Sequence, residues 1–262
     1  KHLVVEKPID VTLAAADRLI EAARAAGVAL TVISQHRFDP GLIELKRLLG
    51  DGALGRLVLA EASTKWYRTQ AYYDSAGWRG TWAMDGGSLM NQGIHYVDLL
   101  RWCMGPVTEV TAVCVTQAHQ VEVEDTALAI VRFASGAIGT ILSSTAAYPG
   151  FPQRLDITGT DGTVIVEDGR IVRRAFGVQA TAGVPGDDAG PDAGAVGAAA
   201  DPAAIEVASH AAQIADLLAA VEEGRAPAVD GQAGRDALEI VRAVYESART
   251  GASVRLTGRP GS

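Results

Sequence analysis

The stretch of sequence that decides the fold is residues 3–33, LVVEKPIDVTLAAADRLIEAARAAGVALTVI. Its first three residues are apolar and predict a strand. An amphipathic helix is expected to begin at Asp10 or Thr12 and to end at Gly27, and residues 28–33 predict a second buried strand. Strand, helix and strand in this order form a βαβ unit with parallel strands. We expect this unit to close a larger α/β domain.

The pattern changes after this unit. We expect a helix from Pro40 to about Leu49, a strand from Arg56 to Tyr67, a loop over residues 68–87 and a helix from about Leu89 to Met104. Short strand candidates with Ser-Gly or Asp-Gly turn signals follow at Val107–Thr116, Thr126–Phe133, Ala137–Ser143, Arg154–Thr158, Thr163–Glu167 and Arg170–Arg174. Because no helix separates these strands, they predict a largely antiparallel sheet, and the chain combines an α/β part with an α+β part.

The last third of the chain contains one stretch that cannot form a core. Residues 176–204 are mostly Gly, Ala, Pro and Asp, and we expect a flexible loop there. Helices are expected to return at Ile205–Glu223 and Gly231–Thr250, because Gly224 and Gly251 lie just past their ends, as C-terminal caps do.

Composition restricts the class of protein. The 262 residues are 48% hydrophobic with a net charge of −8, so a sizeable core is expected. Lys and Arg residues are scattered, which argues against nucleic acid and membranes as partners. The two cysteines, Cys103 and Cys114, form no CxxC pair. We therefore expect neither a zinc site nor a disulfide framework, and a cytoplasmic location.

Three polar residues share one face of the helix predicted after residue 88. Asn91, His95 and Asp98 lie at positions i, i+4 and i+7, among apolar neighbours. One interpretation is an internal hydrogen-bonded set, with Asn91 near the N-cap and His95 bonded to Asp98. The other is a histidine acting as general acid and base, with its ring oriented by a neighbour.

A lysine lies at the end of the first predicted strand, in Glu6-Lys7-Pro8. Ligands of open α/β sheets bind beyond the carboxyl ends of the strands. Lys7 could therefore face a crevice and stabilise a developing alkoxide there, although a solvated lysine at a strand end is the commoner case.

Aromatic residues gather in the loop before the polar helix, although only 5% of the chain is aromatic. The end of the preceding strand and this loop together contain Trp66, Tyr67, Arg68, Tyr72, Tyr73, Trp78, Arg79 and Trp82. Aromatic faces and guanidinium groups suit a sugar ring or a phosphate, and a small satellite core is the alternative. In Asp85-Gly86-Gly87 the glycines let the backbone turn tightly into the helix.

Several familiar motifs are absent from the sequence. His2, His36 and His119 have no metal-like spacing, and we interpret them as structural or surface residues. The glycine fingerprint GxGxxG of dinucleotide-binding domains is also missing, which on its own argues against NAD.

The combination of EKP after a strand, an aromatic WRGTW segment and DGGSLMNQGIHYVDLLRWCMG resembles the glucose–fructose oxidoreductase / inositol dehydrogenase (Gfo/Idh/MocA) family. HAAQIADLLAAVEEGRAP and GRDALEIVRAVYESARTG resemble the closing helices of that family. The resemblance implies a Rossmann domain, of which residues 1–36 would be the C-terminal remnant. It implies that residues 37–262 form a substrate-binding and oligomerisation domain around a mixed, mainly antiparallel sheet. About one hundred residues with the glycine fingerprint would then precede Lys1.

The resemblance also assigns roles. Lys7 corresponds to the family's EKP lysine beside nicotinamide and substrate, and His95 to its catalytic proton relay. Many members carry Asp where this chain has Asn91; an amide cannot take a proton, so Asn91 would position the substrate or His95. Our own hypothesis adds that Asp98 orients His95 or caps the polar stripe of the helix. Members acting on nucleotide-linked sugars can resemble this Asn-containing version.

The expected activity is therefore hydride transfer between a sugar, nucleotide-sugar or polyol hydroxyl and NAD or NADP. The expected catalytic residues are Lys7, Asn91 and His95, without a metal. The expected cofactor-binding residues are Glu6, Lys7, Pro8, Trp78 and Arg79, and the expected substrate-binding residues are Lys7, Arg68, Tyr72, Asn91 and His95. A homo-oligomer, a dimer or tetramer formed through the sheet domain, is expected.

Two other functions stay open at this stage. One is an NAD-dependent glycoside hydrolase of the same superfamily, in which oxidation, elimination and reduction leave no net NADH. The other is a non-catalytic sugar-binding or interaction domain, which the missing glycine fingerprint favours.

Overall fold

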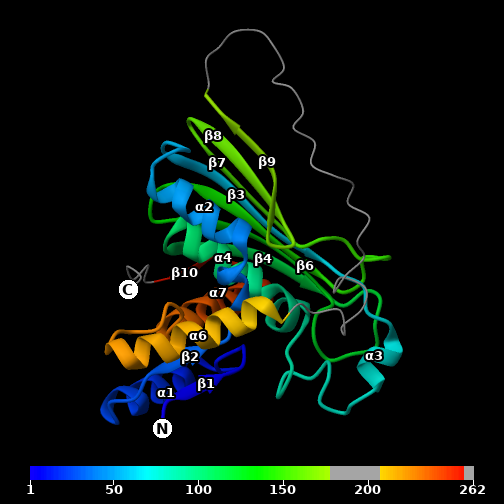
Figure 1. The fold of residues 1–262 in the computed structure, drawn as a ribbon. Helices are drawn as coiled ribbons and strands as arrows, with labels where there is room; N and C mark the ends of the chain where they lie inside the picture. Colours follow the sequence, from blue (N-terminus) through cyan, green and yellow to red (C-terminus); the bar gives the residue numbers. More distant parts are fainter. Residues whose placement is uncertain (178–206, 257–262) are drawn as a thin grey trace.

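Two β-sheets of unequal size organise residues 1–177 and 207–256, the part of the chain that the computed structural model describes (Figure 1). The smaller sheet pairs β1 (Leu3–Val5) with β2 (Leu30–Val32) in parallel, and α1 (Leu13–Ala25) connects them. The predicted βαβ unit is therefore confirmed. The division of the chain into two domains at residue 36 stays a prediction.

The larger sheet has eight strands in the order β10-β4-β5-β6-β3-β7-β8-β9. Its strands are β3 (Leu57–Lys65), β4 (Val107–Val115), β5 (Thr126–Phe133), β6 (Ile138–Ser144), β7 (Arg154–Gly159), β8 (Gly162–Glu167), β9 (Arg170–Phe176) and β10 (Val254–Arg255). Neighbouring strands are antiparallel except β3 and β6, which run parallel. Two parallel strands need a long crossover connection. Here the crossover from β3 to β6 begins with the helical segment between β3 and β4. The mixed, mainly antiparallel sheet is confirmed.

Helices pack against one face of this sheet, and the βαβ unit lies beyond them (Figure 1). The remaining elements are η1 (Gln35–Phe38), α2 (Pro40–Gly50), α3 (Gln70–Asp74), the π-helix η2 (Leu89–Gly93), α4 (Ile94–Met104), α6 (Ala208–Glu223) and α7 (Gly231–Thr250). Side chains along the strands alternate between buried and exposed because helices cover one face. Along β5, every second side chain from Ala127 to Phe133 is buried. Such alternation is typical of an antiparallel sheet with one covered face.

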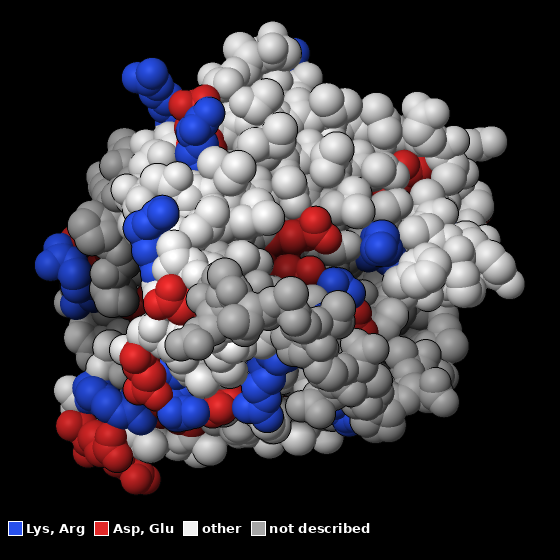
Figure 2. Space-filling model, turned by 90° about the horizontal axis from the view of Figure 1, so that it is seen from above, with Lys and Arg blue, Asp and Glu red and all other residues white. Residues whose placement is uncertain are grey.

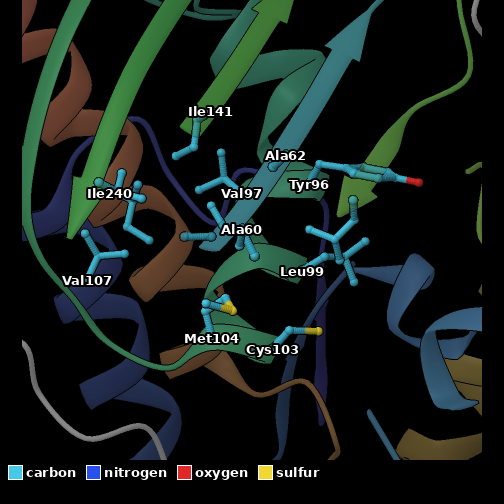
Figure 3. Packing of buried hydrophobic residues seen from close by; sticks show 14 of the residues in the cluster. Ala60, Ala62, Tyr96, Val97, Leu99, Cys103, Met104, Val107, Ile141 and Ile240 are labelled. Carbon is cyan, nitrogen blue, oxygen red and sulfur yellow. The ribbon is translucent and has the colours of Figure 1, made fainter. Parts of the chain in front are cut away.

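Helix α4 lies at the centre of the core. Its side chains Val97 and Leu99 are fully buried, and Val97 lies beside β3, where Ala60 and Ala62 present only methyl groups (Figure 3). Small side chains on the strand let the helix backbone come close. This packing fixes the helix that carries His95 against a rigid support.

Four local features differ from the sequence-based expectation. The helix predicted from Leu89 begins with the π turn η2, so Asn91 lies inside that turn and not at an N-cap. A short helix, α3, capped by Thr69, interrupts the predicted loop. Strand β10 was not predicted, and β9 extends to Phe176, the first residue of the expected flexible loop. The rest of that loop, apart from residue 177, lies outside the described residues.

Charged side chains of both signs are interspersed on the face seen in Figure 2, and no continuous basic patch occupies it. In the described part of the chain, every helix is too short or too polar to cross a membrane.

Helix α2 offers a matched test of the core. Leu42 is fully buried in the main cluster, whereas its neighbour Ile43 is 53% exposed. We expect Leu42→Ala to lower the free energy of unfolding by about 2–5 kcal/mol because it leaves a cavity. Ile43→Ala should change it by roughly 0.5 kcal/mol or less. Urea unfolding followed by circular dichroism measures both values, and equal losses would contradict the described packing.

Candidate functional site

The ammonium group of Lys7 joins the βαβ unit to the π turn. Lys7 lies just past the carboxyl end of β1, and its Nζ donates to the backbone carbonyl of Asn91 at 2.8 Å and to the Asn91 side-chain Oδ1 at 3.0 Å. Burial lowers the pKa of Lys7, and the charges of Glu6 and Asp85 partly oppose that effect. The arrangement fixes one cation at the C-terminal edge of the small parallel sheet.

The Asn91 amide continues this network toward the aromatic loop. Its Nδ2 donates to Asp85 Oδ1, and Asp85 Oδ2 accepts from the backbone N–H of Gly80 at 2.9 Å. The next residue, Gly86, has φ +68°, a left-handed conformation that favours glycine. The predicted tight turn of Asp85-Gly86-Gly87 is therefore confirmed, and it carries the carboxylate that orients Asn91.

His95 and Lys7 line one cavity, partly open to solvent, with about 20 Å³ of free space. Its lining residues come from the segment after β1, from the end of β2 and the two residues after it, and from α4 and α7: Lys7, Pro8, Ile9, Val32, Ile33, Ser34, Ile94, His95, Asp98, Gly234 and Ala237. Burial lowers the pKa of His95 well below its ordinary value, and the charges of Lys7, His36 and His210 lower it further. The imidazole is therefore neutral near pH 7 and can accept a proton.

The two ring nitrogens of His95 have no hydrogen-bond partner among the described residues, but the ring has an aromatic neighbour. His36 lies edge-to-face with it, with 5.2 Å between the ring centroids, and the His36 Nδ1 lies 2.7 Å from Asp39 Oδ2. Sequence reasoning missed this role for His36. Its place in QHRFDP, just beyond the carboxyl end of β2, was the available signal.

Asp98 does not orient His95. Its carboxylate accepts hydrogen bonds from Ser34 and from two nitrogens of Arg37, at 2.8 Å for Nε and 2.5 Å for Nη2. Both side chains of this ion pair are nearly buried. The expected bond between His95 and Asp98 is thus wrong, because a bidentate guanidinium occupies the carboxylate. Asp98 instead ties α4 to η1.

The two arginines of the aromatic loop stack on its rings. The guanidinium of Arg79 lies 4.2 Å from the Tyr72 ring centroid and 4.5 Å from that of Trp78, and its Nη1 donates to the Tyr72 hydroxyl at 2.6 Å. Buried Arg68 lies 4.9 Å from the ring of Trp66 and 5.4 Å from that of Tyr72. This cation–π ladder has the packed character of a satellite core and keeps two cations beside the site.

Comparisons with known proteins identify the family that this chain resembles in sequence and structure. The sequence model of the GFO/IDH/MocA C-terminal domain matches residues 42–165. The structure matches the WlbA dehydrogenase from Bordetella pertussis, solved in complex with NADH and UDP-GlcNAcA, at 33% identity and a TM-score of 0.82, covering 98% of this chain and 72% of that one. The chain belongs to the Gfo/Idh/MocA family.

Other Gfo/Idh/MocA proteins match over different shares of their length. Myo-inositol 2-dehydrogenase of Thermotoga maritima is 30% identical over 178 residues, which are 65% of this chain and 50% of that protein. D-apiose dehydrogenase of Paraburkholderia graminis is 26% identical over 97% of this chain and 66% of its own length. The chain spans about half the length of several of the curated relatives that it matches.

The structure brings together only some of the residues predicted for a Gfo/Idh/MocA site. Lys7, Pro8 and His95 line the cavity, and Asn91 contacts Lys7. Glu6, which is exposed, and the loop residues Arg68, Tyr72, Trp78 and Arg79 are not among the described residues of its wall. Their roles in binding stay predictions. Within residues 1–177 and 207–256, no three His, Cys, Asp or Glu side chains gather as metal ligands.

The ion pair of Arg37 and Asp98 gives a test of the framework. We expect Asp98→Ala to lower the free energy of unfolding by about 3–5 kcal/mol, because it leaves the Arg37 charge buried and unpaired. Replacing both residues, Arg37→Met with Asp98→Leu, should cost less than the single change. Denaturant titration measures both; a double variant less stable than Asp98→Ala would contradict the assignment.

Proposed function

We propose that this chain provides the substrate side of a site in which a sugar, nucleotide-sugar or polyol hydroxyl exchanges a hydride with NAD or NADP. The observation that carries the proposal is the cavity that Lys7 and His95 share, with Asn91 holding the lysine. The names of the relatives support the reaction class, because they include dehydrogenases of inositol and apiose and a complex with NADH.

The residues present fit a nicotinamide ring. Pro8, Ile9 and Ile33 give the cavity an apolar wall beside the Lys7 ammonium. Apolar surface with a few polar groups is typical of cofactor sites. These residues would hold the nicotinamide, which when bound accepts or donates the hydride.

Two side chains of the cavity supply the complementary chemistry. His95, neutral near pH 7, takes the proton of the reacting hydroxyl as a general base and returns it in the reverse direction. Lys7 stabilises the negative charge that develops on the same oxygen. Asn91 takes no proton; it accepts two hydrogen bonds from Lys7 and fixes that charge in place.

The cation–π ladder is proposed as the binding surface for the rest of the substrate. Arg68, Tyr72, Trp78 and Arg79 combine aromatic faces with guanidinium groups, which suit a sugar ring and an anionic substituent. The WlbA complex with UDP-GlcNAcA supports a nucleotide-linked substrate.

Residues 1–36 are proposed as the last βαβ unit of a dinucleotide-binding domain. The parallel pairing of β1 with β2 and the position of Lys7 at their carboxyl edge support this. A cytoplasmic location is proposed because Cys103 and Cys114 are both free thiols.

The activity test uses His95→Ala and Lys7→Ala. Formation of reduced nicotinamide is followed with inositols, aldoses and nucleotide-linked sugars in turn, with NAD and with NADP. With a substrate that the wild type turns over, each variant should lose about 10²–10⁴-fold in kcat/KM, the usual contribution of a general base or oxyanion group. Because the pKa of His95 is lowered, the acid-side loss of wild-type kcat/KM should begin below about pH 6.5.

The same assay separates the other functions. Unchanged kcat/KM in His95→Ala would contradict the proposal. Net hydrolysis of a glycoside without reduced nicotinamide would identify a glycoside hydrolase, and sugar binding without turnover in any of these reactions would identify a binding module.

A homo-oligomer formed through the open face of the large sheet is also proposed. That face presents neighbouring exposed apolar side chains from β3 to β6, among them Leu59 (45% exposed), Val113 (63%), Leu128 (51%), Ile130 (58%) and Ile138 (44%). Contiguous apolar patches of this kind mark protein interfaces. Because the patch lies on one face of one sheet, a second copy can cover it by two-fold symmetry.

We expect Ile130→Lys to shift the protein toward the monomer in analytical ultracentrifugation, because it places a charge in the interface. Ile43→Lys is the control, since Ile43 is 53% exposed on α2, on the helical side of the sheet. A wild-type protein that is monomeric at all concentrations, or an equal effect of both changes, would contradict the proposed interface.

A further inference from the structure

Glu124 lies between β4 and β5, and its carboxyl group is buried, with the residue only 3% exposed. It contacts the start of the helical segment that carries Asn91 and His95. Its Oε1 accepts from the backbone N–H of Leu89 at 2.8 Å and from the Tyr245 hydroxyl at 3.1 Å. Its backbone carbonyl accepts from the N–H of Ser88 at 3.0 Å. One residue thus satisfies two of the free N–H groups at the beginning of the segment.

The second oxygen of this carboxyl group, Oε2, is buried without a partner among the described residues. It lies against Gly87, where a Cβ atom would be 1.6 Å from it. Only glycine can therefore occupy position 87 while Glu124 keeps this place. The second glycine of Asp85-Gly86-Gly87 makes room for a carboxyl group as well as turning the chain.

A series of contacts through Gly87 and Asn91 connects Glu124 with Lys7. The N–H of Asn91 donates to the carbonyl of Gly87 at 3.0 Å, so the backbone that Glu124 clamps also places Asn91. Asn91 in turn presents both oxygens that accept from the Lys7 ammonium. A shift of the first turn would move those two oxygens together.

We propose that Glu124 is a positioning residue whose carboxyl group, through the first turn of η2, places the Asn91 oxygens that hold Lys7, and that its ionisation loosens this hold. The structural part of the proposal stands on these contacts alone. Its meaning for catalysis rests on the function proposed above.

The titration of Glu124 has a defined direction. Burial raises its pKa to about 7, opposed by the hydrogen bonds from Leu89 and Tyr245, and the charge of Asp125 raises it further. The titratable groups facing it are Tyr245 on α7, Asp125 beside it in the chain and Cys114 on β4. Because the pKa is raised on folding, its contribution to stability is complete below the ordinary pKa of about 4.3 and is lost as pH rises through about 7.

Ionisation is unfavourable here for a physical reason. A carboxylate with one buried oxygen and no partner for it lacks the solvation that the charge needs. The bonds from Leu89 and Tyr245 favour the charged form, so the loosening comes from Oε2: above about pH 7 this oxygen needs water and draws the carboxyl group away from the first turn.

The test follows the side-chain amide signal of Asn91 by NMR as a function of pH, in the full chain and without substrate or cofactor. We expect a transition with a midpoint near pH 7 in the wild type and none in Glu124→Gln. Tyr245→Phe removes a hydrogen bond that lowers the pKa of Glu124, so it should move the midpoint to higher pH. Glu122→Gln, at an exposed position two residues earlier, should leave the transition unchanged.

An Asn91 signal that does not titrate in the wild type, or that titrates equally in Glu124→Gln, would overturn the proposal. So would a midpoint that stays in place in Tyr245→Phe, a variant that keeps the buried ring. Because no turnover is measured, these results are independent of whether the chain is a dehydrogenase.

Discussion

A buried ammonium group held by two oxygens of one residue is the interaction on which the site depends. Lys7 donates to both the carbonyl and the side chain of Asn91, and burial lowers its pKa. Placing a charge there is costly unless hydrogen bonds and nearby charges replace water. The Asn91 oxygens and the carboxylates of Glu6 and Asp85 do so. The same contacts join the small parallel sheet to the helix of the large one.

The rest of the fold fixes the position of helix α4 relative to the small parallel sheet. Helix α4 rests on Ala60 and Ala62 of β3, while Asp98 and Arg37 tie the same helix to η1, which follows β2. His95 therefore lies on a rigid element. The π turn before α4 is different: π turns are rare and are often found at functional sites. Here it turns the Asn91 oxygens toward Lys7.

Much of the fold could be predicted because its signals are local. The strand Thr126–Phe133 and the helix Gly231–Thr250 have the predicted bounds, since alternation marks the first, and Asp230 and Gly251 cap the second. The π turn could not be predicted, because the same apolar spacing suits an α-helix. Strand β10 has two residues, too few for a pattern.

The site was predicted less completely. The prediction that Lys7 and His95 share one site came from the resemblance to a family and not from residue spacing. The partner of Asp98 lies 61 residues away in the sequence, and nothing local distinguishes Arg37 from a surface arginine. Glu124 and His36 were missed for the same reason: their importance comes from tertiary neighbours, and a single sequence does not contain that information.

The measurement that tests the central claim most directly is the pKa of the His95 imidazole, by NMR titration, with and without the charge at position 7. The positive charge of Lys7 lowers that pKa, so Lys7→Met should raise it, whereas Lys1→Met, at an exposed position, should leave it unchanged. An imidazole whose pKa is the same in Lys7→Met as in the wild type would mean that the two groups do not share one site.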